Sequence, residues 1–472
     1  MSSTRMNARN PLTGLEDYSF EVSSRADVQA ACEAVRRAQP AWQALGAEGR
    51  TTALRALGQA FEAHGAALYE ALSADTGRHR IAKIEAGAVQ SMIAHSIANA
   101  RTVLAPEPER PSVIPGIAGC RRLVPYPVVG VIAPWNFPVV LSMIDTIPAL
   151  MAGCGVVLKP SEVTPRYVEP LRKIFDSVPA IAAVFRVVTG PGSTGADLVD
   201  LADAIVCTGS VRTGRIVAEH AARRFIPAFL ELGGNDPVIV TRSADLERAA
   251  TAVLRASILA SGQACQSLER VYVDRAVYAP FMEKLLQKAR SVRTTAEDPH
   301  GQIGPFIMGR QAEIVRAHIE DAVAKGAKIE IGGRIIERGG VWCEVTVLSN
   351  VSHQMKVMTE ETFGPVIPVM PYDTLDEAVR LANEGDFGLS ANVIAGSEAE
   401  AQALAERLEA GFVSINDISM SSFVLDFEWE PVRFSGLGRA RMGASGIARY
   451  LRVKAVVTSR NPAGDVANMG DI

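Results

Sequence analysis

Residues 128–159, VVGVIAPWNFPVVLSMIDTIPALMAGCGVVLK, hold the pattern that decides the fold. Two short β-branched runs, at 128–133 and 155–159, flank an apolar stretch of helical length at 139–152. Continuous apolar runs of this kind are typical of strands that are buried on both faces of a parallel sheet. The stretch therefore predicts a strand, a crossover helix and a second strand that lies parallel to the first.

The same alternation extends on both sides of this unit. Helical patterns dominate residues 26–103, a helix is expected at 165–177, and strands at 185–190 and 204–210 each lead into a helix. A further α/β unit begins after LELGGNDPVIV, with a helix at about 245–260. Its later elements are a helix at 278–292 and the strands RVYVD, ANVIA, FVSIN and AVVTS. The alternation predicts an α/β fold with parallel sheets, in which ligands bind at the C-terminal ends of the strands.

Composition excludes several classes of protein. The 472 residues are 48% apolar and 21% charged, with a formal net charge of −4 and no basic block, so we expect neither a nucleic acid nor a membrane as a partner. The most apolar region, residues 128–158, is interrupted by prolines and contains Asp145, and residues 1–14 lack the apolar core of a signal peptide. The six cysteines form no CxxC pair, which argues against a metal site and a disulfide framework and fits the reducing cytoplasm.

Two glycine-containing motifs each follow a strand pattern and precede a helix pattern. GPGSTG (190–195) matches the GxGxxG arrangement of dinucleotide-binding loops, but glycines also mark ordinary turns, and an ordinary turn is the preferred interpretation. In TGS (208–210), backbone N–H groups at the helix start are suited to meet a phosphate. A simple helix cap by Ser210 explains TGS equally well.

Three residues carry side chains suited to catalysis, and each also has a structural explanation. Asn136, fixed between two prolines in PWNFP, can donate to a developing oxyanion, although a buried structural asparagine is more common. Glu231, at the end of a strand in LELGG, would be a general base if its surroundings raised its pKa, although most glutamates are surface charges. Cys265, in SGQACQS, would be a nucleophile if it were accessible and its thiolate favoured, although most free cysteines are inert.

Seven motifs occur in a fixed order along the chain, namely PWNFP, KPSE, TGS, ELGG, GQAC, EETFGP and SGLGR. Together they span residues 134–439 and resemble the motifs of the NAD(P)-dependent aldehyde dehydrogenase superfamily. NPLTG near the start and a Gly/Tyr/Lys pattern at 443–454 extend the resemblance over nearly the whole chain. The resemblance implies an aldehyde dehydrogenase-like α/β fold, with two Rossmann-like α/β domains and a small β oligomerisation element.

The resemblance also implies a cysteine-based oxidation of an aldehyde to a carboxylic acid. Cys265 in GQAC would attack the aldehyde carbonyl, and Asn136 and the backbone N–H of Cys265 would stabilise the oxyanion. Hydride transfer to NAD would leave a thioester, and Glu231 would activate the water that hydrolyses it.

The residues implied in cofactor binding come from four of the motifs. Lys159 and Glu361 would contact the ribose hydroxyls, Gly209 and Ser210 would lie at the pyrophosphate, and Phe363 would pack near the nicotinamide. The full set is Trp135, Lys159, Glu162, Gly209, Ser210, Glu361 and Phe363. An acidic residue at position 162 suits a free 2′-hydroxyl and repels a 2′-phosphate, so NAD is expected, with NADP the less favoured alternative.

Two positions depart from the common pattern of the superfamily. Asp145 stands where many members have a lysine, and Ala440 stands where many have a glutamate. Both positions are associated in relatives with proton relay near the general base, so we expect an altered relay. The positions expected to line the substrate pocket are mostly apolar, and they are Phe137, Leu141, Ile144, Asp145, Leu259, Ala264 and Gln266. No arginine is evident there for a second carboxylate, so the expected substrate is an apolar aldehyde, aliphatic or aromatic, rather than succinate semialdehyde.

Domain limits and partners are further expectations from the resemblance. The NAD-binding domain would comprise 1–106 and 128–233, the catalytic domain 234–434, and a bridging element 107–127 and 450–472, which would pair subunits into a homodimer or a homotetramer. Two rival functions are a CoA-acylating aldehyde dehydrogenase and a catalytically silent NAD-binding scaffold. Glu231 argues against the first, which needs no base for water, and the complete catalytic set argues against the second.

Overall fold

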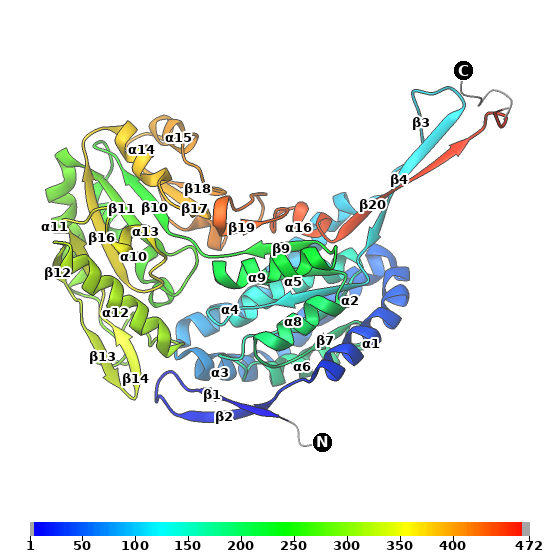
Figure 1. Ribbon diagram of the computed structural model, residues 1–472, viewed down its shortest axis with the longest axis horizontal. Coiled ribbons are helices and arrows are strands. Elements are labelled where there is room, and N and C mark those ends of the chain that lie inside the picture. The colour runs from blue at the N-terminus through cyan, green and yellow to red at the C-terminus, as the bar shows by residue number, and fades with distance from the viewer. Residues whose placement is uncertain (1–3, 465–472) are drawn as a thin grey trace.

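The computed structural model describes residues 4–464, which form two lobes and a projecting arm (Figure 1). The first lobe is built around a six-stranded sheet and the second around a seven-stranded sheet, and the arm is a three-stranded sheet. Strands and helices alternate in both lobes, so the predicted α/β fold with parallel sheets is confirmed. Among residues 4–464 there is no helix both long enough and apolar enough to cross a membrane.

The sheet of the first lobe contains the unit that the opening stretch predicts. Its strands are β5 (Val128–Ile132), β6 (Gly155–Lys159), β7 (Phe185–Val187), β8 (Ala204–Thr208), β9 (Ala228–Glu231) and β19 (Gly436–Leu437). Their order is β19-β9-β8-β5-β6-β7, and all neighbours are parallel except β19 and β9. Every residue of β6 and of β8 is buried, which explains their unbroken apolar sequences.

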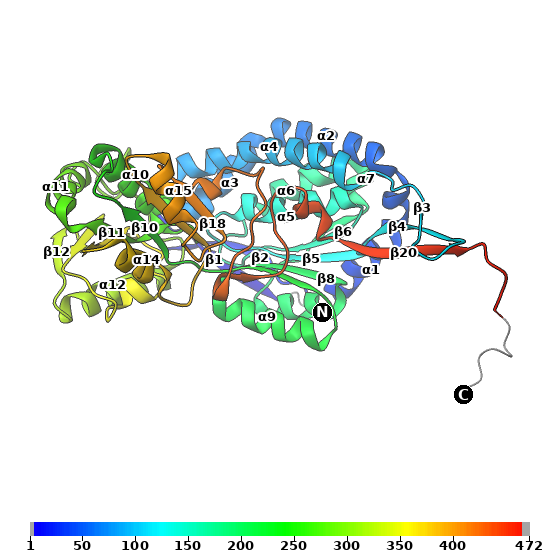
Figure 2. The same ribbon diagram turned by 90° about the horizontal axis from the view of Figure 1, so that it is seen from above.

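Helices cover both faces of this sheet, as Figure 2 shows from above. They are α1 (Arg25–Ala44), α2 (Gly46–Ala63), α3 (Gly65–Thr76), α4 (His79–Val103), α5 (Pro138–Ala152), α6 (Val168–Asp176), α7 (Pro179–Ala182), α8 (Gly192–Leu201), α9 (Val211–Arg223) and α16 (Ser445–Ala448). One hydrophobic cluster packs helices α1, α8 and α9 against one face of the sheet. A larger cluster packs the helices from α2 through α6 against the other face. Helix α5 begins with Pro138 and ends at Gly153, whose φ is 101°. These two residues fix the limits of the crossover helix.

The second lobe repeats the layered plan. Its strands, in sheet order, are β12 (Lys328–Ile331), β15 (Thr346–Ser349), β16 (Val366–Tyr372), β11 (Leu268–Asp274), β10 (Asp236–Val240), β17 (Ser390–Ile394) and β18 (Phe412–Ile415). Only β12 is antiparallel to its neighbour. The helices are α10 (Leu246–Ile258), α11 (Tyr278–Ala289), α12 (Gly309–Ala324), α13 (Lys356–Thr359), α14 (Leu375–Asn383) and α15 (Glu398–Ala405), with 3₁₀ turns η1 (Leu259–Gly262), η2 (Arg275–Val277), η3 (Met420–Ser422) and η4 (Arg433–Ser435). The helix expected at 245–260 is thus α10 followed by the distorted turn η1.

Two hairpins and the arm complete the structure. The hairpins are β1 (Arg5–Arg9) with β2 (Glu16–Glu21) and β13 (Ile335–Arg338) with β14 (Gly340–Cys343). The arm consists of β3 (Arg110–Pro111), β4 (Ile117–Pro125) and β20 (Leu451–Ser459), and β20 pairs with β4 over its whole length. Figure 1 shows the arm reaching away from the first lobe. Residues 1–3 and 465–472 of the expected domains lie outside the described residues.

Candidate active site

The loop that carries Cys265 follows a sharp reversal of the chain. Ala260, Ser261 and Gly262 all have left-handed backbones, with φ of 53°, 62° and 72°. A Cβ on Gly262 would overlap the backbone of Gly364, so this turn packs directly on the EETFGP segment. Residues 264–266 are half-buried, whereas the residues before and after them are buried. The reversal therefore presents Cys265 at an accessible point of an otherwise enclosed loop, and non-glycine residues in this conformation are typical of functional sites.

Gln263 anchors this loop and joins it to Asn136. The Gln263 side chain is fully buried, donates to the Pro305 carbonyl oxygen at 3.0 Å and accepts from the Ile307 N–H at 3.0 Å. The Gln263 carbonyl oxygen accepts from Nδ2 of Asn136 at 3.0 Å. One amide proton of Asn136 is thus used in a hydrogen bond to Gln263, two residues before Cys265. The second amide proton remains available for a ligand.

Arg78 joins the same two segments from beneath. It lies at the start of α4 and is buried, and it donates to the Asn136 carbonyl oxygen and, at 3.1 Å, to the Ala260 carbonyl oxygen. Its guanidinium carbon lies 5.2 Å from the centre of the Phe137 ring. Burial lowers the pKa of Arg78 to about 10, and Glu85 opposes that shift. Nothing in the sequence around Arg78 signals this role.

The LELGG segment meets both other loops at its glycines. The N–H of Gly234 donates to Oε1 of Glu361 at 3.0 Å, and a Cβ on Gly233 would lie 2.6 Å from Oε2 of the same carboxylate. A Cβ on Gly234 would overlap the carbonyl oxygen of Cys265. Only glycine permits these approaches, so the structure brings ELGG, GQAC and EETFGP together at one point between the lobes.

Carboxylates dominate the electrostatics around Cys265. Burial raises the pKa of the thiol to about 12, and the charges of Glu361, Asp236 and Glu231 add to the effect, while Arg441 opposes it. The protein alone therefore does not favour the thiolate, which was one condition for a reactive cysteine. The second condition, accessibility, is met, because Cys265 is partly exposed. A base must remove the thiol proton during attack.

Glu231 is the residue expected to activate the water that hydrolyses the thioester. It ends β9, is only 6% exposed, and its pKa is raised by burial. Arg441 and Arg449 oppose the shift, and Asp145 reinforces it. A buried carboxylate whose pKa is raised is a stronger base than an ordinary surface glutamate, which suits Glu231 to proton transfer.

Asp145 lies inside a buried cluster of charges. Its carboxylate accepts from Nε of Arg441 at 3.2 Å, from Nη2 of Arg449, and from the Tyr450 hydroxyl at 3.3 Å. Its side chain is 1% exposed. Burial would raise the pKa of Asp145, but the charges of the two arginines outweigh burial and lower it. Sequence analysis missed both arginines, although they follow SGLGR within RARMGASGIARY.

The other departure from the common pattern, Ala440, is held by its backbone. Its N–H donates to Oε1 of Glu430 at 3.1 Å, and its side chain is buried. Because residue 440 is an alanine, it places no carboxylate near Asp145. The charge of Asp145 is balanced by Arg441 and Arg449.

Among the expected pyrophosphate and ribose residues, Lys159 and Gly209 lie at the C-terminal ends of β6 and β8, which flank β5 in the first sheet, whereas Glu361 lies in the second lobe. Lys159 ends β6, and its Nζ donates to Oε2 of Glu162 at 2.9 Å. Gly209 follows β8, and Ser210 accepts from the Thr213 N–H at 3.3 Å, which confirms the helix cap of α9. The remaining N–H groups at the start of α9 face an edge where parallel sheets bind ligands.

GPGSTG, in contrast, follows a strand end that is covered. The strand end before it is covered by the segment between β2 and α1, because Ser23 N–H donates to the Thr189 carbonyl oxygen at 2.7 Å and Thr189 Oγ1 donates to the Glu21 carbonyl oxygen at 2.7 Å. A Cβ on Gly190 would overlap the Thr194 side chain. The covered strand end agrees with the preferred interpretation of this motif as an ordinary turn, which remains a prediction.

A cavity of about 470 Å³ opens beside Glu361 and is also lined by His318 and Lys356. Burial raises the pKa of Glu361 to about 7. Trp135 and Phe363 form an edge-to-face pair with ring centres 5.5 Å apart, which connects PWNFP to EETFGP. The cavity lies in the second lobe, and Phe363 of the aromatic pair belongs to the same EETFGP segment as Glu361. A buried carboxylate, a lysine and an aromatic pair fit a group that carries hydroxyls and a flat ring.

The residues expected to line the substrate pocket differ in their burial and surroundings. Phe137, Leu141, Ala264 and Gln266 are half-buried. Ile144 lines a small cavity of about 30 Å³ together with Met92, Leu425 and Arg441. Leu259 is 39% exposed. Met92 and Leu425 come from segments that sequence analysis did not assign to the site.

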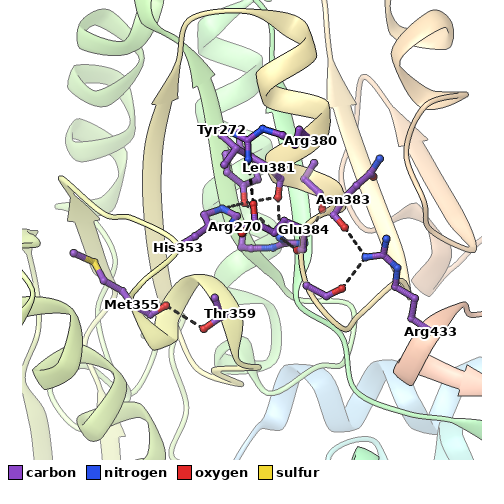
Figure 3. Close-up of polar contacts among 12 residues, drawn as sticks. Arg270, Tyr272, His353, Met355, Thr359, Arg380, Leu381, Asn383, Glu384 and Arg433 are labelled. Atoms are coloured by element: carbon purple, nitrogen blue, oxygen red, sulfur yellow. Dashed lines mark hydrogen bonds and ion pairs between the residues drawn. The ribbon is translucent and has the colours of Figure 1, made fainter.

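Buried polar contacts brace the second lobe around the LELGG segment, and Figure 3 shows part of them. Nε of Arg270 donates to the Asn235 carbonyl oxygen at 2.8 Å, while its terminal nitrogens donate to the Leu381, Ala382 and Glu384 carbonyl oxygens. These carbonyls lie at the C-terminal end of α14, where helix carbonyls have few partners, and that of Leu381 also accepts from the Glu384 N–H at 3.3 Å. Arg270 therefore links α14 to the residue that follows LELGG.

Comparison with known proteins places this arrangement in a family. The model of the "Aldehyde dehydrogenase family" matches residues 1–456. The solved structure of "Putative Aldehyde Dehydrogenase PutA" from Anabaena variabilis is 47% identical with a TM-score of 0.95, covering 98% of this chain and 99% of that chain. The 4,4'-diapolycopene aldehyde oxidase of Methylomonas sp is 37% identical over 463 residues, 97% of this chain and 86% of the relative. A protein of Mycolicibacterium smegmatis named "Putative succinate-semialdehyde dehydrogenase" with NADP(+) is 37% identical over 466 residues, 95% of this chain and 87% of the relative.

Proposed function

Because this chain belongs to the aldehyde dehydrogenase family, which uses NAD(P), we propose that it oxidises an apolar aldehyde, aliphatic or aromatic, to the carboxylic acid with NAD. The observation that carries the proposal is the meeting of three loops around Cys265. Asn136 donates to the carbonyl two residues before the thiol, and Gly234, held by Glu361, packs on the carbonyl of Cys265 itself. This arrangement gives the thiol an amide donor and carboxylates within one enclosed site.

In the proposed mechanism Cys265 attacks the aldehyde carbon as its proton leaves for a base. The free amide proton of Asn136 and the N–H of Cys265 stabilise the oxyanion, which contributes about 3 kcal/mol for each donor. A bound nicotinamide supplies a hydride acceptor. Loss of hydride from the same carbon leaves a thioester on Cys265. Glu231 then takes a proton from water as the water attacks the thioester carbon. The bond between that carbon and the Cys265 sulfur breaks, and the carboxylic acid is released.

The proposed cofactor-binding residues fit NAD in three respects. Lys159, Glu162, Gly209 and Ser210 lie at or just after the C-terminal ends of β6 and β8, and Glu361 borders a cavity of the second lobe. Glu162 is paired with Lys159, so a 2′-phosphate there would meet a carboxylate rather than a free cation. This pairing supports NAD over NADP.

The apolar substrate class rests on the wall of the cleft. Leu141 and Cys265 both pack against the main hydrophobic cluster of the first lobe, as do Phe412 and Leu425. Arg441, a buried cation that lines a small cavity with Leu425, has its charge balanced by Asp145. A second substrate carboxylate would therefore find no uncommitted positive partner in this group. A tenfold preference for succinate semialdehyde over hexanal and benzaldehyde in kcat/KM would contradict this class.

The arm supports the proposed oligomer. Strand β20 has exposed side chains from Arg452 onward, among them Val453, Val456 and Val457. An exposed strand edge with apolar side chains is suited to pairing with another subunit. We propose a homodimer or homotetramer, located in the cytoplasm, with the NAD-binding domain at 1–106 and 128–233, the catalytic domain at 234–434, and the arm as the bridging element.

The proposal is tested by NADH formation with a panel of aldehydes, comparing the native protein with Cys265→Ser. The native protein should form NADH and Cys265→Ser should not. Among the aldehydes, hexanal and benzaldehyde should have the highest kcat/KM. Turnover that requires CoA would favour the CoA-acylating alternative, and NAD binding without turnover of any aldehyde would favour a silent scaffold.

A further inference from the structure

Glu231 belongs to a buried cluster of four charged side chains. Arg441 and Arg449 both contact the carboxylate of Asp145, and Nη1 of Arg449 lies 3.9 Å from Oε1 of Glu231. The side chains are between 1% and 7% exposed. The four residues come from α5, β9 and the C-terminal segment after β19, so the cluster is assembled only by the fold.

Counting the charges gives the cluster a simple property. Asp145 carries one negative charge and the two arginines carry two positive charges, so the group is neutral only when Glu231 is ionised. A buried cluster with an unbalanced charge is strongly disfavoured. Burial of Glu231 itself acts in the opposite direction, toward its protonated form. The state of Glu231 is therefore set by the competition between these two effects.

Arg449 is fixed well enough to hold Glu231 in place. Its guanidinium carbon packs against two rings, 5.2 Å from the centre of Phe229 and 5.0 Å from that of Tyr450. Nη2 donates to Asp145 and, at 2.9 Å, to the Tyr450 hydroxyl, and Nη1 donates to the Arg439 carbonyl oxygen at 3.4 Å. Its Nε is buried without a partner among the described residues. These contacts hold the guanidinium group in place, and they therefore also hold its distance to Glu231.

We propose that Arg449 is a positioning residue for Glu231, and that Asp145 and Arg441 complete a charge-balanced cluster which keeps this carboxylate ionised for its role in thioester hydrolysis. The assignment of that role rests on the proposed function, whereas the charge coupling does not. Arg449 touches neither substrate nor cofactor in this scheme. It acts through the orientation and charge of Glu231.

The proposal predicts opposite effects from two neighbouring substitutions. The charged and titratable groups that face Glu231 are Arg441, Arg449, Asp145 and Glu430, and Cys265 lies across the site. Arg449→Gln removes a positive charge, so Glu231 becomes harder to ionise and the acidic limb of thioester hydrolysis moves to higher pH. Asp145→Asn removes a negative charge, so the limb moves to lower pH. Each shift should be about one pH unit, as is usual for a charge within a few ångströms.

The experiment measures the rate of NADH formation after the first turnover against pH in the native protein, Arg449→Gln, Arg449→Lys and Asp145→Asn. Arg449→Lys should restore the native limb, and the control Arg452→Gln, an exposed arginine on β20, should not move it. Shifts of opposite sign support the proposal. An unchanged limb in folded Arg449→Gln and Asp145→Asn, or shifts of the same sign, would overturn it.

A second readout does not require turnover. Infrared difference titration follows protonation of Glu231 directly, with its carboxyl band assigned by loss in Glu231→Gln. If the native protein forms no NADH, the proposed function fails, and the titration still tests the charge coupling. If Arg449→Gln does not fold, the comparison of the native protein with Arg449→Lys and Asp145→Asn decides the matter. A Glu231 band that titrates at the same pH in all three would overturn the proposal.

Discussion

Gly234 and Glu361, which lie 127 residues apart in the sequence, are joined by a 3.0 Å hydrogen bond from the glycine N–H to the carboxylate. The bond fixes Glu361 beside the loop that carries Cys265, and its other oxygen lies against Gly233. Burial raises the pKa of Glu361 to about 7. The charge of this carboxylate therefore changes within the pH range in which the enzyme would be assayed.

The first prediction concerns the pH dependence of NAD binding. Below pH 7 the protonated form of Glu361 dominates, and a protonated carboxyl accepts fewer hydrogen bonds from ribose hydroxyls than a carboxylate does. The KM for NAD should therefore rise as the pH falls from 8 to 6. In Glu361→Gln it should be high at both values, whereas the exposed control Glu337→Gln should follow the native protein. A native KM that is flat across this range would contradict the assignment.

The second prediction concerns Arg78. Arg78→Met removes the donors to the Asn136 and Ala260 carbonyl oxygens and leaves Glu85 without its buried counter-charge. Removing one partner of a buried charge pair costs about 3–5 kcal/mol of unfolding free energy. Displacement of the amide donor should reduce kcat about a hundredfold. Arg80→Met, at an exposed position two residues on, is the matched control, and equal behaviour of the two variants would refute the role.

The third prediction separates backbone strain from steric overlap at the nucleophile loop. Gly46 and Gly262 have φ of 66° and 72°, but only Gly262 faces another backbone, while Gly46 has nothing within 4 Å. Gly46→Ala should cost about 1 kcal/mol for its left-handed conformation. Gly262→Ala should cost a further 2 kcal/mol or so because the turn and Gly364 must separate. Thermal unfolding of both variants measures the difference, and equal losses would show that the contact with Gly364 is loose.

The fourth prediction concerns the thiol. With a pKa of about 12, Cys265 is almost entirely protonated at neutral pH, and its thiolate fraction grows about tenfold for each pH unit. Alkylation by iodoacetamide in the absence of NAD and substrate should accelerate accordingly between pH 7 and pH 9, as followed by mass spectrometry of the Cys265 peptide. The half-buried Cys120 serves as an internal comparison. A rate that is already at its plateau at pH 7 would show a preformed thiolate.

The sequence predicted those parts of the structure that depend on local pattern. The apolar runs of β5, β6 and β8 and the glycine and proline limits of α5 identify strands and helices without reference to distant residues. The order of motifs was sufficient for the family, which the comparisons confirm. The roles of Cys265, Asn136 and Glu231 remain predictions.

Contacts between distant segments were not predictable. In the sequence, Asp145 is only a departure from the lysine that many relatives have. Its charge is balanced by Arg441 and Arg449, which lie about 300 residues away. These arginines reach Asp145 because the C-terminal segment returns to the first lobe. Arg78 is one of many arginines until the turn at Ala260 places a carbonyl oxygen within its reach. Periodicity and turn signals carry no information about such pairs.

The most direct test of the account is the mass of the Cys265 peptide after the variant Glu231→Gln is mixed with hexanal and NAD. The account predicts that acylation proceeds and hydrolysis is slow, so the peptide should gain the mass of the aldehyde less two hydrogens, as expected for a thioester. An unmodified Cys265 in a sample that has formed NADH, or an acyl group on another residue, would contradict the central claim.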